Sequence, residues 1–581
     1  MKINRITKNI FTIRDKSDKS EKGFATGGII SGRGTILIGC DDRLTPEIIS
    51  GMGIGEVLTI LCCDYRRSAN AGVLNFEGAD KYINENFYDL LARPELWWEA
   101  PENRWHLYKL RPDDDILPYG ADNVKKITEN DNKNKNEIII DGVKITVLFT
   151  PGDTDYSVSY LVEDEGVKVV FCGGLLYKGG KIPYLYRTTL GIFGQGCEDY
   201  HGYLRGISQW KKSLELISAG DVLVPYLGQV IDDPKGDIAE FNKNIDEYYD
   251  KYAEISAMNF YFSGLNGGAK KMEYGKMKPF PGYVKSIGSQ CNLIISKDKS
   301  AFAVDCGGAE AADFMQAMIE RGEIKSVDAL YISHYHDDHV NGCGYFRERF
   351  SCPIYADKIQ ADIIKNPAAY RLPCISPVFT DVTPLDDGCF WQWREFELTS
   401  FNFPGQTLYH GGLMVKNTES GEVVFFAGDS FNPSGIDDYC AYNRNLLTPG
   451  EGYFKCIGII KKHAPDYIIN QHVESAFTFT AEQLTYMEKN LTERVRILQK
   501  LSPWDDINFL HDEYFVMACP YEQNEKGEKI GVEFLISDYA KDIKCEIIEP
   551  AKRAKNKKIY GVRIYAGDMY LGQKACFIVN L

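Results

Sequence analysis

The chain has 581 residues, of which 44% are hydrophobic and 13% aromatic, enough to bury more than one core, so a disordered protein is excluded. Its formal net charge of −16 makes the phosphate backbone of a nucleic acid an unfavourable partner. No run of about eighteen apolar residues is available to span a membrane. The sixteen cysteines form no Cys-x-x-Cys pair and the N-terminus lacks the apolar core of a secretory signal, so we expect reduced thiols and a cytoplasmic location.

An insertion rich in aromatic residues lies between residues 86 and 115 and contains Trp97, Trp98 and Trp105. Core packing is the ordinary role of such side chains, but an aromatic insertion also suits a substrate-binding surface. We therefore keep Trp98 and Trp105 as substrate-binding candidates beside the core-packing interpretation.

Residues 237–257 carry apolar side chains at helical spacing, which predicts an amphipathic helix. Residues 264–278, with paired glycines and several lysines, are typical of a linker.

The densest group of chemistry-bearing side chains is residues 333–342, Ser-His-Tyr-His-Asp-Asp-His-Val-Asn-Gly, after an apolar stretch that predicts a strand. Residues two apart on an extended segment point the same way, so His334 and His336 are directed at one point. Asp338 and His339 leave the strand end toward a neighbouring point. Imidazoles with a carboxylate suit Zn²⁺ or Fe, and two adjacent points suit a two-metal centre.

Three later segments continue the pattern. Residues 403–410 contain Pro-Gly-Gln-Thr, residues 423–429 form an apolar run that ends on Asp429, and residues 466–472 end on His472. A second amphipathic helix is predicted for residues 481–501.

After Pro503 the pattern changes to short alternating runs separated by turns, as at 514–518, 531–536 and 561–565. Such runs predict a small β-sandwich of immunoglobulin-like size.

In their order and spacing, the motif and the three later segments resemble the metallo-β-lactamase superfamily, whose hallmark His-x-His-x-Asp-His follows a strand. The implied ligands are His334, His336 and His410 for one ion, Asp338, His339 and His472 for the other, and Asp429 for both. Zn²⁺ is the expected metal, with Fe or Mn as alternatives. Two such cations generate a hydroxide nucleophile, which Asp338, the expected catalytic residue, would orient while passing a proton to the leaving group. Asp305, in an earlier Asp-Cys-Gly-Gly turn, is expected to support the metal loop without binding metal.

The third ligand departs from the family pattern, because Gln406 stands where the family places a histidine. Our preferred interpretation is a local shift that brings His410 into the first site. In the alternative, Gln406 lies near the metal through water and His410 supports the site from outside. Gln406 and Tyr409 are also kept as substrate-binding candidates.

The first 230 residues resemble a second copy of the same fold that has lost its ligands. Residues 58–70 align without gaps on residues 329–341, which places Cys63, Tyr65, Arg67 and Ser68 opposite the four motif ligands. Three further segments recur in the same order: 151–154, 169–175 and 223–228. We expect no metal in this copy.

The expected fold class is therefore α/β (α+β), with tandem αββα sandwiches and a C-terminal immunoglobulin-like β-sandwich. The expected domains are a degenerate, metal-free copy (1–235), a helical linker (236–280), a metal-binding copy (281–502) and the β-sandwich (503–581).

The resemblance implies a metal-dependent hydrolase that acts on a small or medium ester, lactone, thioester, amide or phosphoester. We expect a small-molecule substrate and neither a nucleic-acid nor a membrane partner, and the sequence carries no signal for the oligomeric state. Two alternatives stay open: an iron-dependent redox enzyme of the same fold acting on a thiol or oxygen, and a non-catalytic scaffold.

Overall fold

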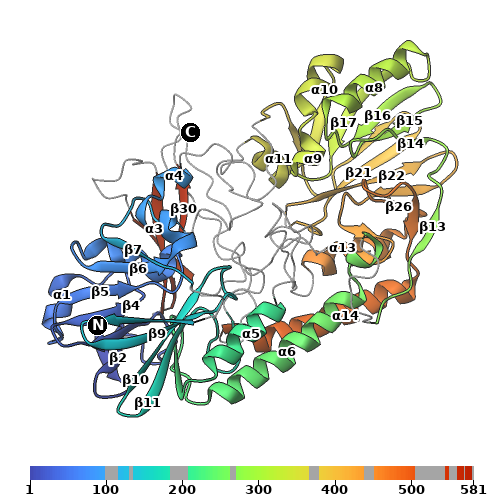
Figure 1. The fold of residues 1–581 in the computed structure, drawn as a ribbon. Coiled ribbons are helices and arrows are strands. Elements are labelled where there is room, and N and C mark those ends of the chain that lie inside the picture. Colours follow the sequence, from blue (N-terminus) through green and yellow to red (C-terminus); the bar gives the residue numbers. More distant parts are fainter. Residues whose placement is uncertain are drawn as a thin grey trace. The chain divides into compact units, whose positions relative to one another are not determined.

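The computed structural model describes residues 1–98, 116–129, 135–182, 207–261, 270–365, 379–407, 409–437, 451–503, 543–548, 559–567 and 569–578. The chain divides into two compact units of mixed α/β structure (Figure 1). Unit 1 consists of Met1–Arg104, Tyr108–Asp246 and Leu498–Leu581, and unit 2 of Trp105–Leu107 and Glu247–Ile497.

The first sheet of unit 1 has its strands in chain order: β1 (Lys2–Arg5), β2 (Ile10–Arg14), β3 (Thr26–Ile30), β4 (Thr35–Ile38), β5 (Val57–Leu61), β6 (Asp80–Asn84) and β7 (Val124–Ile127). Pairing is antiparallel as far as β4 and parallel from β4 to β7. Parallel neighbours need crossover connections. These contain α1 (Pro46–Gly51), α2 (Arg67–Asn70), η1 (Ala71–Asn75), η2 (Glu85–Phe87), α3 (Tyr88–Ala92) and α4 (Glu95–Trp98).

The second sheet of unit 1 has the order β12-β11-β10-β9-β8. Its strands are β8 (Lys135–Ile140), β9 (Val143–Phe149), β10 (Val158–Asp164), β11 (Val167–Gly173) and β12 (Val222–Pro225). Only the β11–β12 pair of this order is parallel, and α5 (Ile207–Ile217) lies between those two strands in the chain. Ile38 and Leu61 from one sheet and Val147 and Phe171 from the other share one buried cluster, so the core lies between the two sheets.

The C-terminal strands β28 (Ile543–Ile548), β29 (Ile559–Ala566) and β30 (Met569–Ile578) form an antiparallel sheet that belongs to unit 1. Tyr570 and Leu571 are part of the same buried cluster as the two larger sheets. The Asp42 carboxylate accepts hydrogen bonds from Arg563 Nε at 2.8 Å, from the Tyr570 hydroxyl and from Gln573 Nε2 at 3.1 Å. Two of the runs expected to build a β-sandwich, 514–518 and 531–536, lie outside the described residues, so the immunoglobulin-like topology stays a prediction.

Unit 2 also contains two large sheets. The first sheet has the order β14-β15-β16-β17-β18-β19, made of β14 (Val284–Ser286), β15 (Asn292–Ile295), β16 (Ser300–Val304), β17 (Ser326–Ile332), β18 (Ile354–Asp357) and β19 (Thr383–Leu385). It is antiparallel as far as β16 and parallel beyond it. The helices between its strands are α8 (Ala309–Glu320), α9 (Asp337–Val340), α10 (Cys343–Phe350) and α11 (Lys358–Lys365).

The second sheet of unit 2 has the order β13-β27-β26-β23-β22-β21-β20. Its strands are β13 (Lys276–Lys278), β20 (Phe390–Trp393), β21 (Phe396–Asn402), β22 (Gly411–Asn417), β23 (Val423–Phe426), β26 (Tyr467–Ile469) and β27 (Ala476–Thr478). The hairpin of β24 (Phe431–Asn432) and β25 (Gly435–Ile436) and the helix α13 (Gly452–His463) follow β23 in the chain. Phe302 and Ala329 from the first sheet share a buried cluster with Leu413 and Phe426 from the second.

Two long helices confirm the sequence prediction. They are α6 (Pro234–Glu254) and α14 (Ala481–Leu501), and the short α7 (Met258–Tyr261) follows α6. In unit 2 Arg494 of α14 lies over the ring of Tyr248 of α6 and donates to its hydroxyl at 3.2 Å. Apolar spacing of 3.6 residues therefore located both helices to within a few residues.

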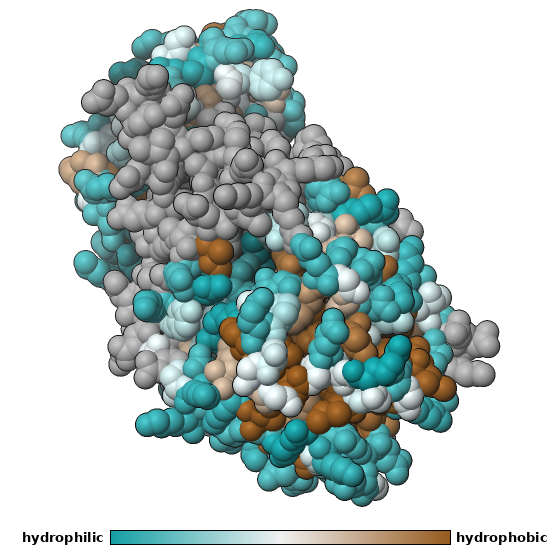
Figure 2. Space-filling view, turned by 90° about the vertical axis from the view of Figure 1, so that its left-hand side faces the viewer, coloured by the Kyte–Doolittle hydropathy of each residue, from teal (hydrophilic) through white to brown (hydrophobic). Residues whose placement is uncertain are grey.

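Hydrophilic residues cover much of the described surface in the face drawn in Figure 2, and hydrophobic residues gather in the lower half of that view. Among the described residues, no helix is both long and apolar enough to cross a bilayer.

Candidate metal centre

The metal motif begins where the buried strand β17 ends, and a buried carboxylate behind it fixes its shape. Ser333 donates to Asp305 through its backbone N at 2.6 Å and through Oγ at 2.7 Å. Asp305 also accepts from His339 Nδ1 at 3.0 Å. These contacts hold the two ends of the motif together and confirm the supporting role expected for Asp305.

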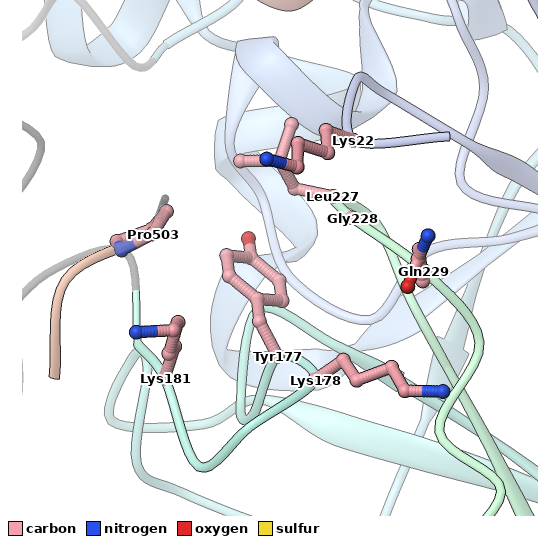
Figure 3. Close-up of a pocket in the computed structure, with 8 residues that line it drawn as sticks. All are labelled: Lys22, Tyr177, Lys178, Lys181, Leu227, Gly228, Gln229 and Pro503. Carbon is pink, nitrogen blue, oxygen red and sulfur yellow. The ribbon is translucent and has the colours of Figure 1, made fainter. Parts of the chain in front are cut away.

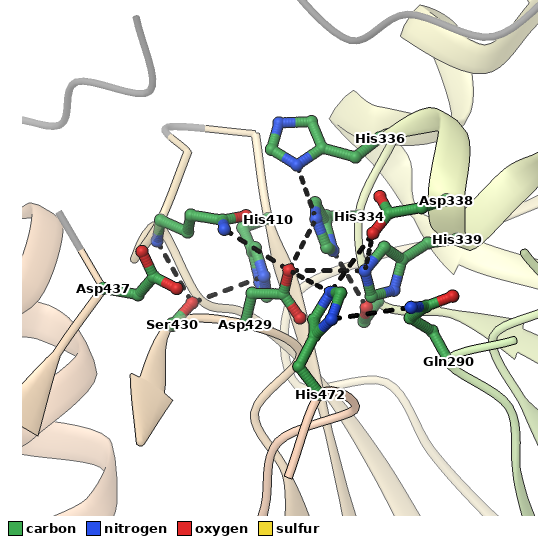
Figure 4. Close-up of polar contacts among 12 residues, drawn as sticks. Gln290, His334, His336, Asp338, His339, His410, Asp429, Ser430, Asp437 and His472 are labelled. Carbon is green, nitrogen blue, oxygen red and sulfur yellow. Dashed lines mark hydrogen bonds and ion pairs between the residues drawn. The ribbon is translucent and has the colours of Figure 1, made fainter. Parts of the chain in front are cut away.

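The structure brings six of the predicted ligands into two groups that share Asp429. In the part of the chain that the structure describes, groups of this kind are Asp338, His339, Asp429 and His472, and His334, His336 and Asp429 (Figure 4). In each group the potential ligand atoms all lie within 4.8 Å of one another.

The Asp429 carboxylate lies at the centre of both groups. Its Oδ2 is 3.3 Å from His339 Nε2, 3.2 Å from His472 Nε2 and 3.8 Å from His334 Nε2. The two strand-end imidazoles face each other, with His334 Nε2 2.9 Å from His336 Nδ1. The convergence predicted from the i, i+2 spacing is therefore confirmed.

The centre is buried on one side and open on the other. His334, His336 and His339 are at most 1% exposed, whereas the side chain of Asp338 is 43% exposed and that of His472 is 32% exposed. His472 Nε2 lies 3.2 Å from Asp338 Oδ2. Among the described ligand residues, Asp338 and His472 therefore mark the more exposed side of the centre.

Burial and nearby charges shift the pKa values of the histidines in the two groups in opposite directions. Burial lowers the pKa of His334 and the neighbouring imidazoles lower it further, so this ring is neutral. Burial alone would also lower the pKa of His472, but Asp429 and Asp338 outweigh it and raise the pKa to about 10. A divalent cation would replace protons at such a site, because metal ligands bind in their deprotonated forms.

The residues present fit a divalent metal. Asp429 Oδ1 and Gln406 Oε1 are buried and make no hydrogen bond. Burying an oxygen atom without a partner is costly, and a cation beside the Asp429 carboxylate would offset that cost for Asp429 Oδ1. A donor set of imidazole and carboxylate suits Zn, Fe or Mn.

His410, the expected third ligand, lies outside both groups. Its Nδ1 faces the carbonyl of Gly411 at 2.8 Å and its Nε2 faces Ser430 Oγ at 3.3 Å. The His410 ring is stacked on His334 with 4.6 Å between ring centroids, and burial lowers its pKa to about 3. His410 therefore supports His334 by packing, and both of its nitrogens are directed at other partners.

Gln406 lies closer to the shared carboxylate. Its side chain is buried, with Nε2 3.3 Å from Asp429 Oδ2, and its backbone N donates to Ser430 Oγ at 3.2 Å. A half-turn of the terminal amide would direct Oε1 at the same place, since the two amide atoms exchange positions.

The family model described as Metallo-beta-lactamase superfamily matches residues 287–439. Residues 287–439 belong to the metallo-β-lactamase superfamily. The match contains five of the six grouped ligands, and His472 follows it along the chain.

The chain is also similar over part of its length to individual known proteins. The chain is 30% identical over 127 residues to hydroxyacylglutathione hydrolase of Marinomonas sp. (strain MWYL1), a match of 21% of this chain and 47% of that protein. The chain thus spans about half the length of this curated relative. Among solved structures, Rm3 metallo-beta-lactamase is 16% identical, with a TM-score of 0.29 over 39% of this chain and 95% of that chain. The HARLDQ-motif enzyme of Cronobacter sakazakii is 14% identical, with a TM-score of 0.29 over 39% and 94%.

The remaining predicted residues fall around the metallo-β-lactamase site or outside the described residues. Tyr409 is buried, and its ring centroid is 6.5 Å from that of Tyr335. The side chain of Trp98 and the whole of Trp105 lie outside the described residues, so their substrate-binding role stays a prediction.

Two residues near the metallo-β-lactamase centre were not expected from the sequence. Gln290 Nε2 is 3.5 Å from His472 Nδ1, and the Tyr261 hydroxyl is 3.4 Å from Asn470 Oδ1. Both come from segments before the motif, far from any recognised pattern. Only the packing of the unit brings them to the site.

Unit 1 repeats the backbone hydrogen bonds that surround the motif. Gly39 N bonds Leu61 O, Cys40 N bonds Ala69 O and Val158 N bonds Cys63 O. The corresponding pairs in unit 2 are Asp305 N with Tyr331 O, Cys306 N with His339 O and Gly411 N with Ser333 O. Cys63 thus corresponds to Ser333, one residue away from the gapless alignment, which is a correction to the expected register.

In the corrected register Asp64 and Arg66 take the places of His334 and His336. Arg66 Nη2 donates to Asp64 Oδ2 at 2.6 Å and Arg66 Nη1 to Asp153 Oδ1 at 2.7 Å. All three side chains are at most 3% exposed. Asp64 and Arg66 therefore occupy positions that hold imidazoles in unit 2, and the buried guanidinium of Arg66 also bonds Asp153.

Proposed function

We propose that the chain is a metal-dependent hydrolase whose centre lies in unit 2 and holds two divalent ions. The observation that carries the proposal is the shared Asp429, because two adjacent ligand groups joined by one carboxylate suit a two-metal centre. The residues that would hold the first ion are His334, His336, Gln406 and Asp429. Those for the second are Asp338, His339, His472 and Asp429.

When bound, the ions would supply Lewis acidity and lower the pKa of a water molecule. The surrounding side chains orient the residues that would hold the ions. Asp305 accepts the Nδ1 proton of His339 and so directs Nε2 toward Asp429. Stacking of His410 on one face of His334 restricts the rotation of that ring. The ligand geometry is thus fixed by hydrogen bonds and packing before any substrate arrives.

Asp338 is suited to handle the proton of the reaction. It is the more exposed of the two grouped carboxylates and lies at the open side of the centre. Although burial opposes ionisation, His339 and His472 hold the pKa of Asp338 below its usual value, so the carboxylate is ionised and free to orient a water molecule. It would take the proton of that water and deliver it to the leaving group.

The substrate class we propose is a small ester or thioester. The relative from Marinomonas carries the name of a hydroxyacylglutathione hydrolase, which denotes cleavage of a thioester. Hydrolysis of either bond needs a nucleophile and stabilisation of a developing oxyanion, and a two-metal centre supplies both. The net charge of −16 favours a small substrate over a nucleic acid.

The test combines metal analysis with a substrate panel. We expect about two ions per chain and hydrolysis of an ester, lactone or hydroxyacylglutathione thioester in preference to a phosphodiester. His336→Ala should lose the first ion and the activity with it, whereas the matched control His463→Ala, a histidine on α13 outside the centre, should keep both ions and the activity. A protein that binds two ions but cleaves nothing in the panel would contradict the hydrolase assignment.

For unit 1 we infer a metal-free copy of the same fold, supported by the shared strand order and the repeated hydrogen bonds. The positive charge of Arg66 between Asp64 and Asp153 supplies locally what a cation would supply. Metal analysis of the His336→Ala protein tests this, because unit 2 then keeps at most its second ion, and any further ion per chain would contradict a metal-free unit 1.

A further inference from the structure

His472 is the most exposed histidine of the two ligand groups. Its side chain is 32% exposed, whereas the other grouped histidines are at most 1% exposed. Its main chain is fixed, because its backbone N donates to Asn470 Oδ1 at 2.7 Å and Asn470 Nδ2 donates to the carbonyl of Phe431 at 2.9 Å. The imidazole can still rotate about its own side-chain bonds, so its direction depends on what the ring contacts.

The ring of His472 has a partner on each side. Its Nε2 lies 3.2 Å from an oxygen of each acidic ligand, and its Nδ1 lies 3.5 Å from Nε2 of Gln290 (Figure 4). A histidine that binds metal through one nitrogen donates the proton of the other to an acceptor, as His339 does to Asp305. A half-turn of the Gln290 amide presents Oε1 as that acceptor. Gln290 is therefore placed to fix the ring when an ion is bound at Nε2.

Gln290 reaches His472 from a strained turn between β14 and β15. The φ angles of Gly288, Ser289 and Gln290 are 84°, 48° and 54°, so three successive residues are in the left-handed region. Residues other than glycine avoid this region because Cβ crowds the following carbonyl oxygen. Strain of this kind persists where the surrounding structure enforces it, and it gathers at functional sites.

Hydrogen bonds to the segment after β16 hold the strained turn in place. Gly307 N donates to the carbonyl of Ser289 at 3.0 Å. Ser289 Oγ donates to Glu310 Oε1 at 2.6 Å. The side chain of Gln290 is thus presented to the metal centre from a backbone that is anchored on both its main chain and a neighbouring side chain.

Gly307 allows this turn to lie close to a ligand loop. A Cβ added at Gly307 would collide with the carbonyl oxygen of Asp338 and would lie 2.9 Å from Oε1 of Gln290. In unit 1 the corresponding residue is Asp41, since each follows the cysteine of the matched backbone hydrogen bonds. The close approach is therefore a feature of the unit that has the ligand groups.

The equivalent turn of unit 1 lies at the equivalent place with different side chains. Leu227 corresponds to His472, because β12 pairs with β11 as β26 pairs with β23. Lys22, from the turn between β2 and β3, lines one pocket with Leu227 (Figure 3), and Gly228 N donates to Lys22 O at 3.0 Å. Unit 2 thus pairs a histidine with an amide where unit 1 places a leucine beside a lysine.

We propose that Gln290 is a positioning residue for the second metal ion, because its amide holds the imidazole of His472 with Nε2 directed at the ligand group. The inference rests on the two-ion centre of the proposed function and adds a residue to it. Gln290 acts through His472 and is not itself a ligand. Loss of such a partner lowers metal affinity about 10–100-fold.

The test is the zinc content of the full-length protein after dialysis at buffered free zinc concentrations. Gln290→Leu keeps the size of the side chain but removes its hydrogen-bonding atoms, so it should lower the affinity for the second ion at least about tenfold. It should then retain one ion over a range of free zinc in which the wild type retains two. Gln290→Glu should retain two, because a carboxylate also accepts the Nδ1 proton. The matched control Gln316→Leu, on α8 outside both ligand groups, should also retain two.

The double variant of Gln290→Leu with His336→Ala shows which ion is lost. His336 belongs to the first group alone, so the double variant should retain neither ion over that range. If it retains one, the two residues serve the same ion and the assignment of Gln290 to the second is wrong.

Other results would also overturn the proposal. These are a Gln290→Leu protein that retains two ions or loses both, and a Gln290→Glu protein that binds as weakly as Gln290→Leu. The metal-free melting temperature of Gln290→Leu should equal that of the wild type, since a fall would show that Gln290 stabilises the turn instead. A wild-type protein that retains fewer than two ions at saturating zinc would overturn the two-ion centre itself, so the two failures are distinguishable.

Discussion

Replacing Gln406 with alanine is expected to weaken the binding of the first metal ion and to leave the binding of the second unchanged. The change leaves His334, His336 and the shared Asp429 as donors for the first ion and touches no donor of the second. Losing a partner outside the ligand set typically weakens metal affinity about 10–100-fold. Losing a donor should therefore lower the affinity for the first ion at least about 100-fold. This corresponds to about 2.8 kcal/mol, at about 1.4 kcal/mol per tenfold change.

His410→Ala is the matched comparison for this variant. It removes the stacking on His334 and the contact with Ser430, but no atom of either ligand group. We expect a loss of first-ion affinity nearer to about tenfold, typical of a supporting residue. Gln406→His should strengthen the binding of the first ion, because imidazole binds transition metals better than a neutral amide does.

The measurement is metal content by mass spectrometry after dialysis against zinc at buffered free concentrations. Gln406→Ala should retain one ion over a range of free zinc in which His410→Ala retains nearly two. A cobalt-substituted sample gives a second readout through its absorption spectrum. If His410→Ala loses more metal than Gln406→Ala, then His410 is the third ligand and the geometric argument for Gln406 is wrong.

Three other outcomes are expected. Arg66→Met should destabilise unit 1 by about 3–5 kcal/mol, because it leaves two carboxylates buried without their cation. Hydrogen exchange of the β5 amides should report a loss of stability of that size. A loss below about 1 kcal/mol would argue against a buried ion pair. Asp357 has a pKa raised by burial to about 6, so the stability it contributes at low pH is lost as pH rises from about 4 through 6. Urea titration should accordingly find Asp357→Asn more stable than the wild type by up to about 3 kcal/mol at pH 8 and little changed at pH 4, and equal gains at both pH values would refute the assignment. Chelation should reduce amide protection in β17 but not in β5, because only unit 2 is expected to gain stability from metal, and parallel losses in both strands would contradict a metal-free unit 1.

Local patterns predicted the features of the centre that depend on local geometry. The alternation of side chains along a strand was enough to bring His334 and His336 together. Asp429 was placed beside them by the resemblance of residues 423–429 to a segment of the metallo-β-lactamase superfamily.

Features that depend on contacts between distant segments could not be predicted from the sequence. Phe403 N bonds His410 O at 2.7 Å, and the backbone of His410 forms a bridge with that of His334, so His410 lies where its Nδ1 faces the carbonyl of Gly411. The expected register of unit 1 was wrong by one residue because the alignment was based on sequence similarity alone. The backbone pairing of Cys63 with Val158 fixes it instead.

The C-terminal strands also determine when the first unit can be completed during synthesis. Tyr570 belongs to the core formed by β2 to β11, yet it leaves the ribosome roughly 300 residues after Asp246, the last residue of the N-terminal part of unit 1. At about 5–20 residues per second that interval lasts roughly 15–60 s. Unit 2, continuous apart from a short segment, has its sequence finished sooner. The N-terminal part of unit 1 is therefore translated before unit 2 but completes its core after it, so its hydrophobic edge stays open in the nascent chain until Tyr570 and Leu571 of β30 join the core.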